Sequence, residues 1–401
     1  MTNFFRQMTA FSQSNSSSLS HRTRLTFIVF LLFFLLLPSL RVFYKYLPYP
    51  SVLTLVWFSL ILFLLLRLMR GAHPRLQSYL ANPYFIASSL FLLAVLVWVI
   101  YPMADGLKTQ MRGSDQDDCV ILGALQLLEF KYPYTVRSYF NNPCSTGPGI
   151  LLLYLPFVWL KAYALGAVAV LVTVCFCLRK VSTSWLPVGL FLFLLVSSFA
   201  IDELLVVGSD LVALSLGLTI LALTIPSAVA QKSLGALSLL GLLCGLLSAS
   251  RLNFLILFPF LSLLIFWHWK KGGLVFFCFA LVSSLGPALL LYLTDSAHFT
   301  PLHLASKAGG LLSPLMMGLA AFICLILGLI ALGLGKKNLT TLPLSLFLFL
   351  TPMLFFLALA DWMNRGWSFA QWEGANYLIP VIPLVALILT QGVLGRQAYP
   401  R

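Results

Sequence analysis

Residues 85–104 read FIASSLFLLAVLVWVIYPMA and contain no Asp, Glu, Lys or Arg. At about 1.5 Å of rise per residue, a helix of this length crosses the roughly 30 Å hydrocarbon core of a bilayer. Similar apolar runs recur along the chain, which is 60% hydrophobic and only 9% charged. This composition excludes an ordinary soluble domain and predicts an all-α, polytopic membrane protein.

The apolar runs predict about twelve transmembrane helices within one domain, residues 25–396. They cover residues 25–40, 51–66, 85–104, 150–178, 186–201, 208–226, 233–249, 252–268, 273–293, 311–334, 342–360 and 376–394. The run at 150–178 is long for one helix and contains Lys161, so we expect it to be tilted or broken. Residues 1–24 are mostly polar and rich in Ser, which predicts a disordered cytoplasmic tail.

The charged residues predict which side of the membrane each loop faces. With the N-terminus in the cytoplasm, most groups of Lys and Arg fall in inner loops, as the positive-inside rule expects. The same arrangement places all 11 acidic residues at the outer side. The net charge of +14 is scattered between apolar runs and does not indicate a nucleic acid partner. The longest outer loop is 105–149, in which the apolar stretch 119–130 is too short to span and predicts an interfacial helix.

An acidic cluster, Ser114-Asp115-Gln116-Asp117-Asp118, precedes this short helix. It could serve in helix capping, because carboxylates accept the free amide hydrogens at a helix N-terminus. It could instead form a functional acidic site, which we favour because a third carboxylate adds repulsion that capping does not require. An Asp-x-Asp pair alone is a weak metal signal, since hard cations take more oxygen ligands. We therefore assign no metal ligands and no certain cofactor, although a divalent metal could bind here.

Several short motifs follow one another along the chain from the acidic cluster onward. They are Asp115-Gln-Asp117-Asp-Cys-Val120-Ile-Leu-Gly-Ala124, Tyr132-Pro133-Tyr134, Ser145-Thr-Gly-Pro148-Gly-Ile-Leu-Leu-Leu-Tyr154-Leu-Pro156, Gly245-Leu-Leu-Ser-Ala249-Ser-Arg251 and Tyr377-Leu-Ile-Pro380-Val-Ile-Pro383. In these elements the chain resembles the GT-C membrane glycosyltransferases. It is most similar to the polyprenyl-phosphomannose-dependent mannosyltransferases of bacteria and to the first mannosyltransferase of GPI-anchor synthesis. One departure is Asn376, which stands where many relatives have Arg; Arg365 is a candidate substitute.

The resemblance implies an inverting transfer of a sugar, mannose or another hexose or pentose, from a polyprenyl-phosphate donor to a lipid-linked or cell-surface acceptor. The site would lie on the extracytoplasmic face of a bacterial inner membrane or, alternatively, of the endoplasmic reticulum. An attacking hydroxyl needs a carboxylate to accept its proton, and the departing phosphate needs positive charge. Asp117 is the candidate base because Val120 follows it at the family spacing, and Asp115 supports it. Further substrate-binding candidates are Asp118, Tyr134, Asp202, Asp210, Arg251, His298, His303, Lys307 and Arg365.

The same span pattern also fits other classes of membrane protein. About twelve spans would suit a secondary transporter, a flippase of lipid-linked glycans or a glycan ligase. Transporters place ionisable groups near the bilayer midplane, whereas the acids here lie at one rim, which favours the enzyme. Asp202 and Asp210 could simply be solvated, and Arg251 could extend to the interface. Cys119 and Cys144 could form a disulfide in an oxidising compartment, or Cys119 could pack into the interface.

Overall fold

The computed structural model describes residues 21–70, 74–110, 114–302, 310 and 312–394. Helices form most of these residues, and β-type pairing among them is limited to one isolated bridge between Arg137 and Pro143. The sequence predicts one transmembrane domain, within which the contacts distinguish two compact units. Unit 1 comprises residues 1–91, 173–203 and 314–401, and unit 2 comprises residues 92–172 and 204–313.

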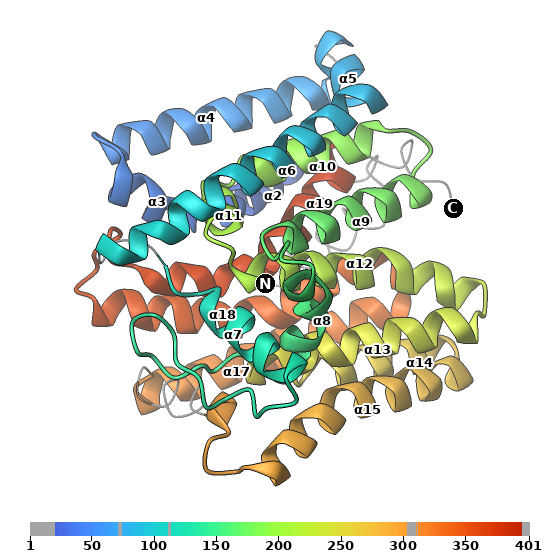
Figure 1. The fold of residues 1–401 in the computed structure, drawn as a ribbon. Coiled ribbons are helices and arrows are strands. Elements are labelled where there is room, and N and C mark those ends of the chain that lie inside the picture. The colour runs from blue at the N-terminus through green and yellow to red at the C-terminus, as the bar shows by residue number, and fades with distance from the viewer. Residues whose placement is uncertain (1–20, 71–73, 111–113, 303–309, 311, 395–401) are drawn as a thin grey trace. The chain divides into compact units, whose positions relative to one another are not determined.

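Unit 1 is built around α19 (Ile382–Leu394), whose side chains are almost all buried and which packs against α2, α10 and α18. Its other elements are α2 (His21–Leu36), α3 (Ser39–Tyr46), α4 (Pro50–Met69), α5 (Pro74–Leu80), α10 (Leu186–Val196), α17 (Pro314–Lys337), η4 (Leu339–Thr341), α18 (Leu342–Asn364) and η5 (Glu373–Val381). The α17 and α18 helices lie side by side (Figure 1).

Unit 2 is built around α13 (Leu234–Ser250), which packs against α15, α8 and α12 (Figure 1). Its other elements are η1 (Leu107–Gln110), α7 (Asp118–Leu128), α8 (Pro148–Trp159), α12 (Asp210–Ala230), η2 (Leu252–Phe254), α14 (Leu257–His268), α15 (Lys270–Thr294) and η3 (Thr300–Leu302). Three helices run from one unit into the other: α6 (Pro83–Gly106), α9 (Leu165–Val181) and α11 (Phe199–Val206).

The apolar helices fall into a buried group and an exposed group. The residues of α12, α18 and α19 are mostly buried, whereas few residues of α4, α6, α15 and α17 are buried. On α6, for example, Phe91 is 71% exposed and Trp98 is 50% exposed. A water-soluble protein rarely exposes continuous apolar surface of this extent, so lipid is the solvent that this surface fits.

In the described residues, seven helices are long and apolar enough to cross a membrane, or up to nine if each of two bent pairs counts as one span. The all-helical, multi-pass class predicted from the sequence is thereby confirmed. The α13 and α14 helices, each predicted as a span, have 17 and 12 residues. The count of twelve therefore stays a prediction.

At one boundary the structure agrees with the sequence prediction, and at another it differs. The run at 150–178 divides into α8 and α9, and the connection contains Lys161 at a φ of 55°. The break that Lys161 suggested is therefore present. The predicted tail extended to residue 24, but α2 begins at His21, because the apolar run is continued by one helical turn at its N-terminal end. Residues 1–20 lie outside the described part of the chain.

The start of α8 lies directly on the last turns of α13. A Cβ atom added to Gly149 would stand 1.8 Å from the Leu246 carbonyl oxygen, and one added to Gly147 would stand 1.9 Å from that of Ala249. The Gly147 amide also donates to the Ser250 carbonyl oxygen at 2.9 Å, which satisfies one of the free carbonyls at the end of α13. Only glycine permits this close approach of the two backbones. The approach fixes the position of the segment before α8 relative to the end of α13, where Arg251 follows Ser250.

We predict that Gly149→Ala destabilises the protein, because the added methyl group must displace either α8 or α13. Overpacking of this kind costs about 1–3 kcal/mol. Gly235→Ala is the matched control, since that glycine lies in α13 with no atom close to an added Cβ. Thermal unfolding in detergent should show a lower midpoint for Gly149→Ala and no lowering for Gly235→Ala. Equal midpoints for the two variants would contradict the packing described here.

Candidate functional site

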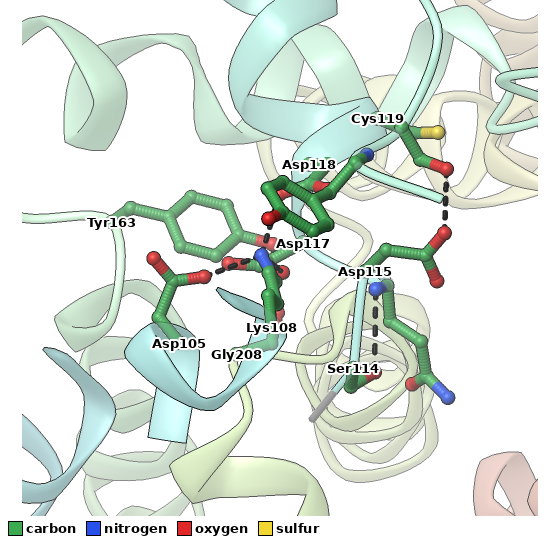
Figure 2. A network of polar contacts seen from close by, with 12 residues as sticks. Asp105, Lys108, Ser114, Asp115, Asp117, Asp118, Cys119, Tyr163 and Gly208 are labelled. Atoms are coloured by element: carbon green, nitrogen blue, oxygen red, sulfur yellow. Dashed lines mark hydrogen bonds and ion pairs between the residues drawn. The ribbon is translucent and has the colours of Figure 1, made fainter. Parts of the chain in front are cut away.

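In unit 2, a buried lysine contacts three carboxylates (Figure 2). Lys108 Nζ lies 2.9 Å from Asp117 Oδ1 and 2.5 Å from Asp118 Oδ1, and it also contacts Asp105 Oδ1. Lys108 is 4% exposed. Withdrawing an ammonium group from water is costly unless it is paired, so these contacts define where the group can lie.

Two stretches of chain supply this cluster. Asp105 occupies the last turn of α6, and Lys108 follows three residues later in η1, so that the two side chains meet over one turn. Asp117 and Asp118 stand at the N-terminus of α7, after residues 111–113, which lie outside the described chain. The apolar run of α6 and the short α7 helix are thus joined by charge pairing near the point where the polar loop begins.

Asp117 is the most buried of the acids in this cluster, with 1% exposure. Although it is the N-cap residue of α7, its side chain makes no capping hydrogen bond. Instead Tyr101 donates its hydroxyl to Asp117 Oδ2 at 2.5 Å, while Lys108 holds Oδ1. Helix capping is therefore the wrong interpretation of Asp117, because the carboxylate is turned toward α6 and away from the amides of its own helix.

Burial raises the pKa of Asp117 above its usual value, while the hydrogen bonds from Tyr101 and Lys108 act in the opposite direction. The neighbouring Asp118 adds a smaller upward effect through like-charge repulsion. Desolvation is therefore the larger cause of the raised pKa, and like-charge repulsion is the smaller one. A carboxyl group with a raised pKa is a stronger proton acceptor than an exposed aspartate once it is ionised.

A tight turn brings the backbone on the N-terminal side of α12 against Asp117. Gly208 has a φ of 70°, and a Cβ atom there would stand 2.7 Å from the Tyr101 ring and 3.3 Å from Asp117 Cβ. The Tyr163 hydroxyl donates to the Gly208 carbonyl oxygen at 2.8 Å (Figure 2). A left-handed backbone and this crowding both require glycine at position 208.

The same turn leads directly to a buried ion pair. Asp210, which is fully buried, accepts two contacts from Arg251 Nη2, at 2.8 Å and 2.9 Å. Because Asp210 is two residues from Gly208, the chain between them spans at most about 7 Å. Because Asp210 is buried, it is not the solvated residue that the sequence allowed. Arg251 binds this carboxylate and does not extend to the membrane interface.

Residues 138–142 of the long loop also contact the acidic cluster. Asp115 Oδ2 accepts hydrogen bonds from the Ser138 hydroxyl at 2.5 Å and from Asn142 Nδ2 at 3.0 Å. The Tyr139 amide donates to Asp118 Oδ2 at 2.7 Å. All three candidate acids of the sequence motif thus have partners other than the amides of α7. Residues 138–142 bind two of these acids, Asp115 and Asp118.

A disulfide ties this loop to α7. Cys119, the residue after Asp118, is bonded to Cys144 with a Cα–Cα distance of 5.0 Å. The possible disulfide between these two cysteines is therefore confirmed. The Thr300 hydroxyl donates to the Cys144 carbonyl oxygen, which attaches the segment after α15 to the same point. Cys144 is consequently attached both to α7 and to the segment after α15.

Several predicted residues are not part of this arrangement. Tyr134 is buried and packs against Phe299, and burial raises the pKa of its hydroxyl. His298 Nδ1 lies 2.7 Å from Asp295 Oδ2, on an exposed stretch after α15. His303 and Lys307 lie outside the described residues.

Two predicted residues belong to unit 1. Asp202 lies on α11. Arg365 pairs with Asp361 Oδ1 at 3.2 Å and with Glu373 Oε2 at 2.8 Å, and so joins the end of α18 to η5. Neither residue therefore belongs to the compact unit that contains Asp117.

Arg41 supplies a cation beside Asn376, the residue at which the sequence departs from the motif that it resembles. Its Nη1 donates to Asn376 Oδ1 at 2.9 Å and lies 3.6 Å from Glu203 Oε2. Arg365 was the candidate substitute, but the hydrogen bond to Asn376 comes from Arg41 on α3. The two residues are 335 positions apart, so their pairing depends on the tertiary fold of unit 1.

The three carboxylates also satisfy the spacing of a cation site. Oxygen atoms of Asp105, Asp117 and Asp118 lie within 4.8 Å of one another. Hard cations such as Mg²⁺ favour oxygen ligands of this kind. The Lys108 ammonium already contacts all three groups, so a divalent ion would have to share or displace it.

Comparison with known proteins adds no assignment. No protein-family model matches the chain, and no curated protein or solved structure matches it either. The site geometry and the sequence motifs are therefore the basis for the functional proposal that follows.

We predict that reducing or removing the Cys119–Cys144 disulfide lowers stability, because the closed loop of about 25 residues contributes about 3 kcal/mol by restricting the unfolded chain. Non-reducing peptide mapping should recover the two cysteines as one linked peptide. The paired variant Cys119→Ser/Cys144→Ser should unfold at a lower temperature, whereas Cys278→Ser, an exposed free cysteine, should not. Recovery of Cys119 and Cys144 only as free thiols from the oxidised protein would refute the pairing.

Proposed function

We propose that this chain is an inverting membrane glycosyltransferase of the GT-C type, with about twelve spans. It would transfer a sugar from a polyprenyl-phosphate donor to a lipid-linked or cell-surface acceptor. The observation that carries the proposal is Asp117, a buried carboxylate that precedes α7. It pairs with Tyr101 of the apolar helix α6 and with Lys108 just after that helix, in place of capping α7. A carboxylate with this environment suits proton transfer better than helix stabilisation.

In this mechanism Asp117 accepts the proton of the acceptor hydroxyl as its oxygen attacks the anomeric carbon. Both Asp117 oxygens have partners, but each carboxylate oxygen can accept a second hydrogen bond, so a hydroxyl can still approach. Inversion follows when attack and departure occur on opposite faces of the sugar in one step. The polyprenyl phosphate leaves as an anion and needs no proton from the protein.

Arg251 is the cation that best fits the departing phosphate. Asp210 occupies only Nη2, and Arg251 Nε is buried without a hydrogen-bond partner in the described structure. A guanidinium group carries five N–H donors, so several remain for phosphate oxygens. The carboxylate that holds this cation, Asp210, is two residues from Gly208, which packs against Asp117. A donor phosphate bound to Arg251 would therefore enter the same compact unit as the proposed base.

The disulfide supports an extracytoplasmic location for residues 105–149, because such bonds persist in oxidising compartments. A bacterial inner membrane is the setting we favour, with the endoplasmic reticulum as the alternative. A lipid-linked donor would enter from the bilayer with its head group at the same rim. This location agrees with the segregation of acidic residues to the outer side.

A transporter or flippase of lipid-linked glycans is the second candidate. The division into two compact units and two bent helix pairs, of 51° and 80°, favours it, since transporters move one unit against another. A reconstituted protein that moves a labelled glycolipid between leaflets without forming a new glycosidic bond would support this alternative and exclude transfer.

For the enzyme we predict that Asp117→Asn lowers sugar transfer by about 10²-fold or more, the usual scale for losing a general base. Asparagine keeps the size of the side chain and can still meet Tyr101 or Lys108 through its oxygen. Asp115→Asn should have an intermediate effect, and Asp118→Asn a mild one. The assay is transfer from a synthetic polyprenyl-phosphate sugar by purified, folded variants. Near-normal turnover by Asp117→Asn would remove it from the role of base.

The pH profile gives an independent check on the same residue. Because burial raises the pKa of Asp117, the acidic limb of kcat/KM should lie above the usual range of an aspartate. Activity should be lost as pH falls through this raised pKa, since the protonated base cannot accept a proton. An acidic limb in the range of an exposed carboxylate would contradict this assignment.

A further inference from the structure

The Lys108 ammonium is occupied by groups of the protein: it donates hydrogen bonds to Asp117 and Asp118 and forms an ion pair with Asp105. An ammonium group has three N–H donors, and three carboxylates contact Lys108 Nζ. Its side chain is 6% exposed. In contrast with Arg251, whose Nε is unpartnered in the described structure, Lys108 is committed entirely to groups of the protein itself. Its role must therefore be exerted through those carboxylates.

The charges around Asp117 show what that role is. With all four groups ionised, Asp105, Asp117, Asp118 and Lys108 carry a net charge of −2, from three negative charges and one positive charge. Burial and the like charge of Asp118 both favour the neutral form of Asp117. Without the ammonium, two of the effects that lower the pKa of Asp117 would be lost, and a protonated carboxyl group cannot act as a base.

We propose that Lys108 is a positioning residue that acts as the internal counter-cation of the carboxylate cluster, keeping Asp117 ionised and fixing the direction of its Oδ1 atom. The inference rests on the proposed function in one respect, which is that Asp117 is the base. The ionisation of Asp117 is a property of the protein alone, so it is measurable without any sugar transfer.

Other groups also face Asp117 and would remain in a Lys108 variant. Tyr101 on α6 donates to Oδ2, and Tyr163, from the connection between α8 and α9, lies close enough to interact electrostatically. Asp105 and Asp118 contribute negative charge. Lys108 is the cation in contact with Asp117 among the described residues, so its removal changes the charge balance in one direction only.

The experiment is an infrared titration of the purified protein in detergent, following the protonated carboxyl band that disappears in Asp117→Asn. We expect Lys108→Gln to move the titration midpoint of Asp117 upward by about 1–3 pH units, the usual effect of an opposite charge at this distance. Lys108→Arg should restore a midpoint near that of the unsubstituted protein. The control is Lys131→Gln, at an exposed lysine 2.6 Å from Glu129, and should leave the midpoint unchanged.

An unchanged midpoint in folded Lys108→Gln would overturn the proposal. If that variant folds poorly, Lys108→Gln/Asp105→Asn restores the net charge of −2 and should also titrate above the unsubstituted protein; an equal midpoint there is again a refutation. A raised midpoint in a protein that transfers no sugar would support the role of Lys108 and refute the proposed function. Loss of transfer in Asp117→Asn with no midpoint shift in Lys108→Gln would do the reverse.

Discussion

The pairing of one ammonium group with three carboxylates is the interaction on which the site depends. Each ion, if withdrawn from water alone, would cost several kcal/mol, and mutual attraction offsets this only when the geometry is close. Lys108 meets this condition with contacts to Asp105, Asp117 and Asp118. The end of α6 and the start of α7 are consequently joined through one ammonium group that contacts all three carboxylates.

Two further constraints complete this arrangement. The Cys119–Cys144 disulfide links α7 to the long loop. In this loop Ser138 binds Asp115 and Tyr139 binds Asp118. Glycine at position 208 lets the backbone approach Asp117 closely, and Asp210, two residues later, binds the Arg251 guanidinium group. Asp117 and Arg251 thus come from separate parts of unit 2, and each is held by contacts within the protein.

The sequence predicted those features that depend on local composition. Apolar runs indicated the helices, Lys161 indicated the break between α8 and α9, and the spacing of the acids indicated a cluster. Tyr101 was missed because an aromatic residue within an apolar run gives no sign of whether it faces lipid or a polar site. Lys108 had one available signal, its position three residues after Asp105, which places the two side chains on one helical face.

The remaining contacts depend on the fold and could not be predicted from spacing. The Asp210–Arg251 pair joins the ends of two helices 41 residues apart, and Arg41 reaches Asn376 across 335 residues. Capping was a reasonable expectation for Asp117 because it precedes α7, but capping competes with stronger pairing to a buried cation. The local sequence therefore identified Asp117 as a residue of interest, whereas the tertiary fold determined that it pairs with Lys108 and Tyr101.

The central claim is that Asp117 and Arg251 face one donor molecule. A density map of the Asp117→Asn variant with a polyprenyl-phosphate sugar tests it most directly, because loss of the base should leave the donor intact. The account predicts that the donor phosphate contacts the Arg251 guanidinium group and that the anomeric carbon lies on the side of residue 117. A donor bound with its phosphate away from Arg251 and its sugar away from residue 117 would contradict the account.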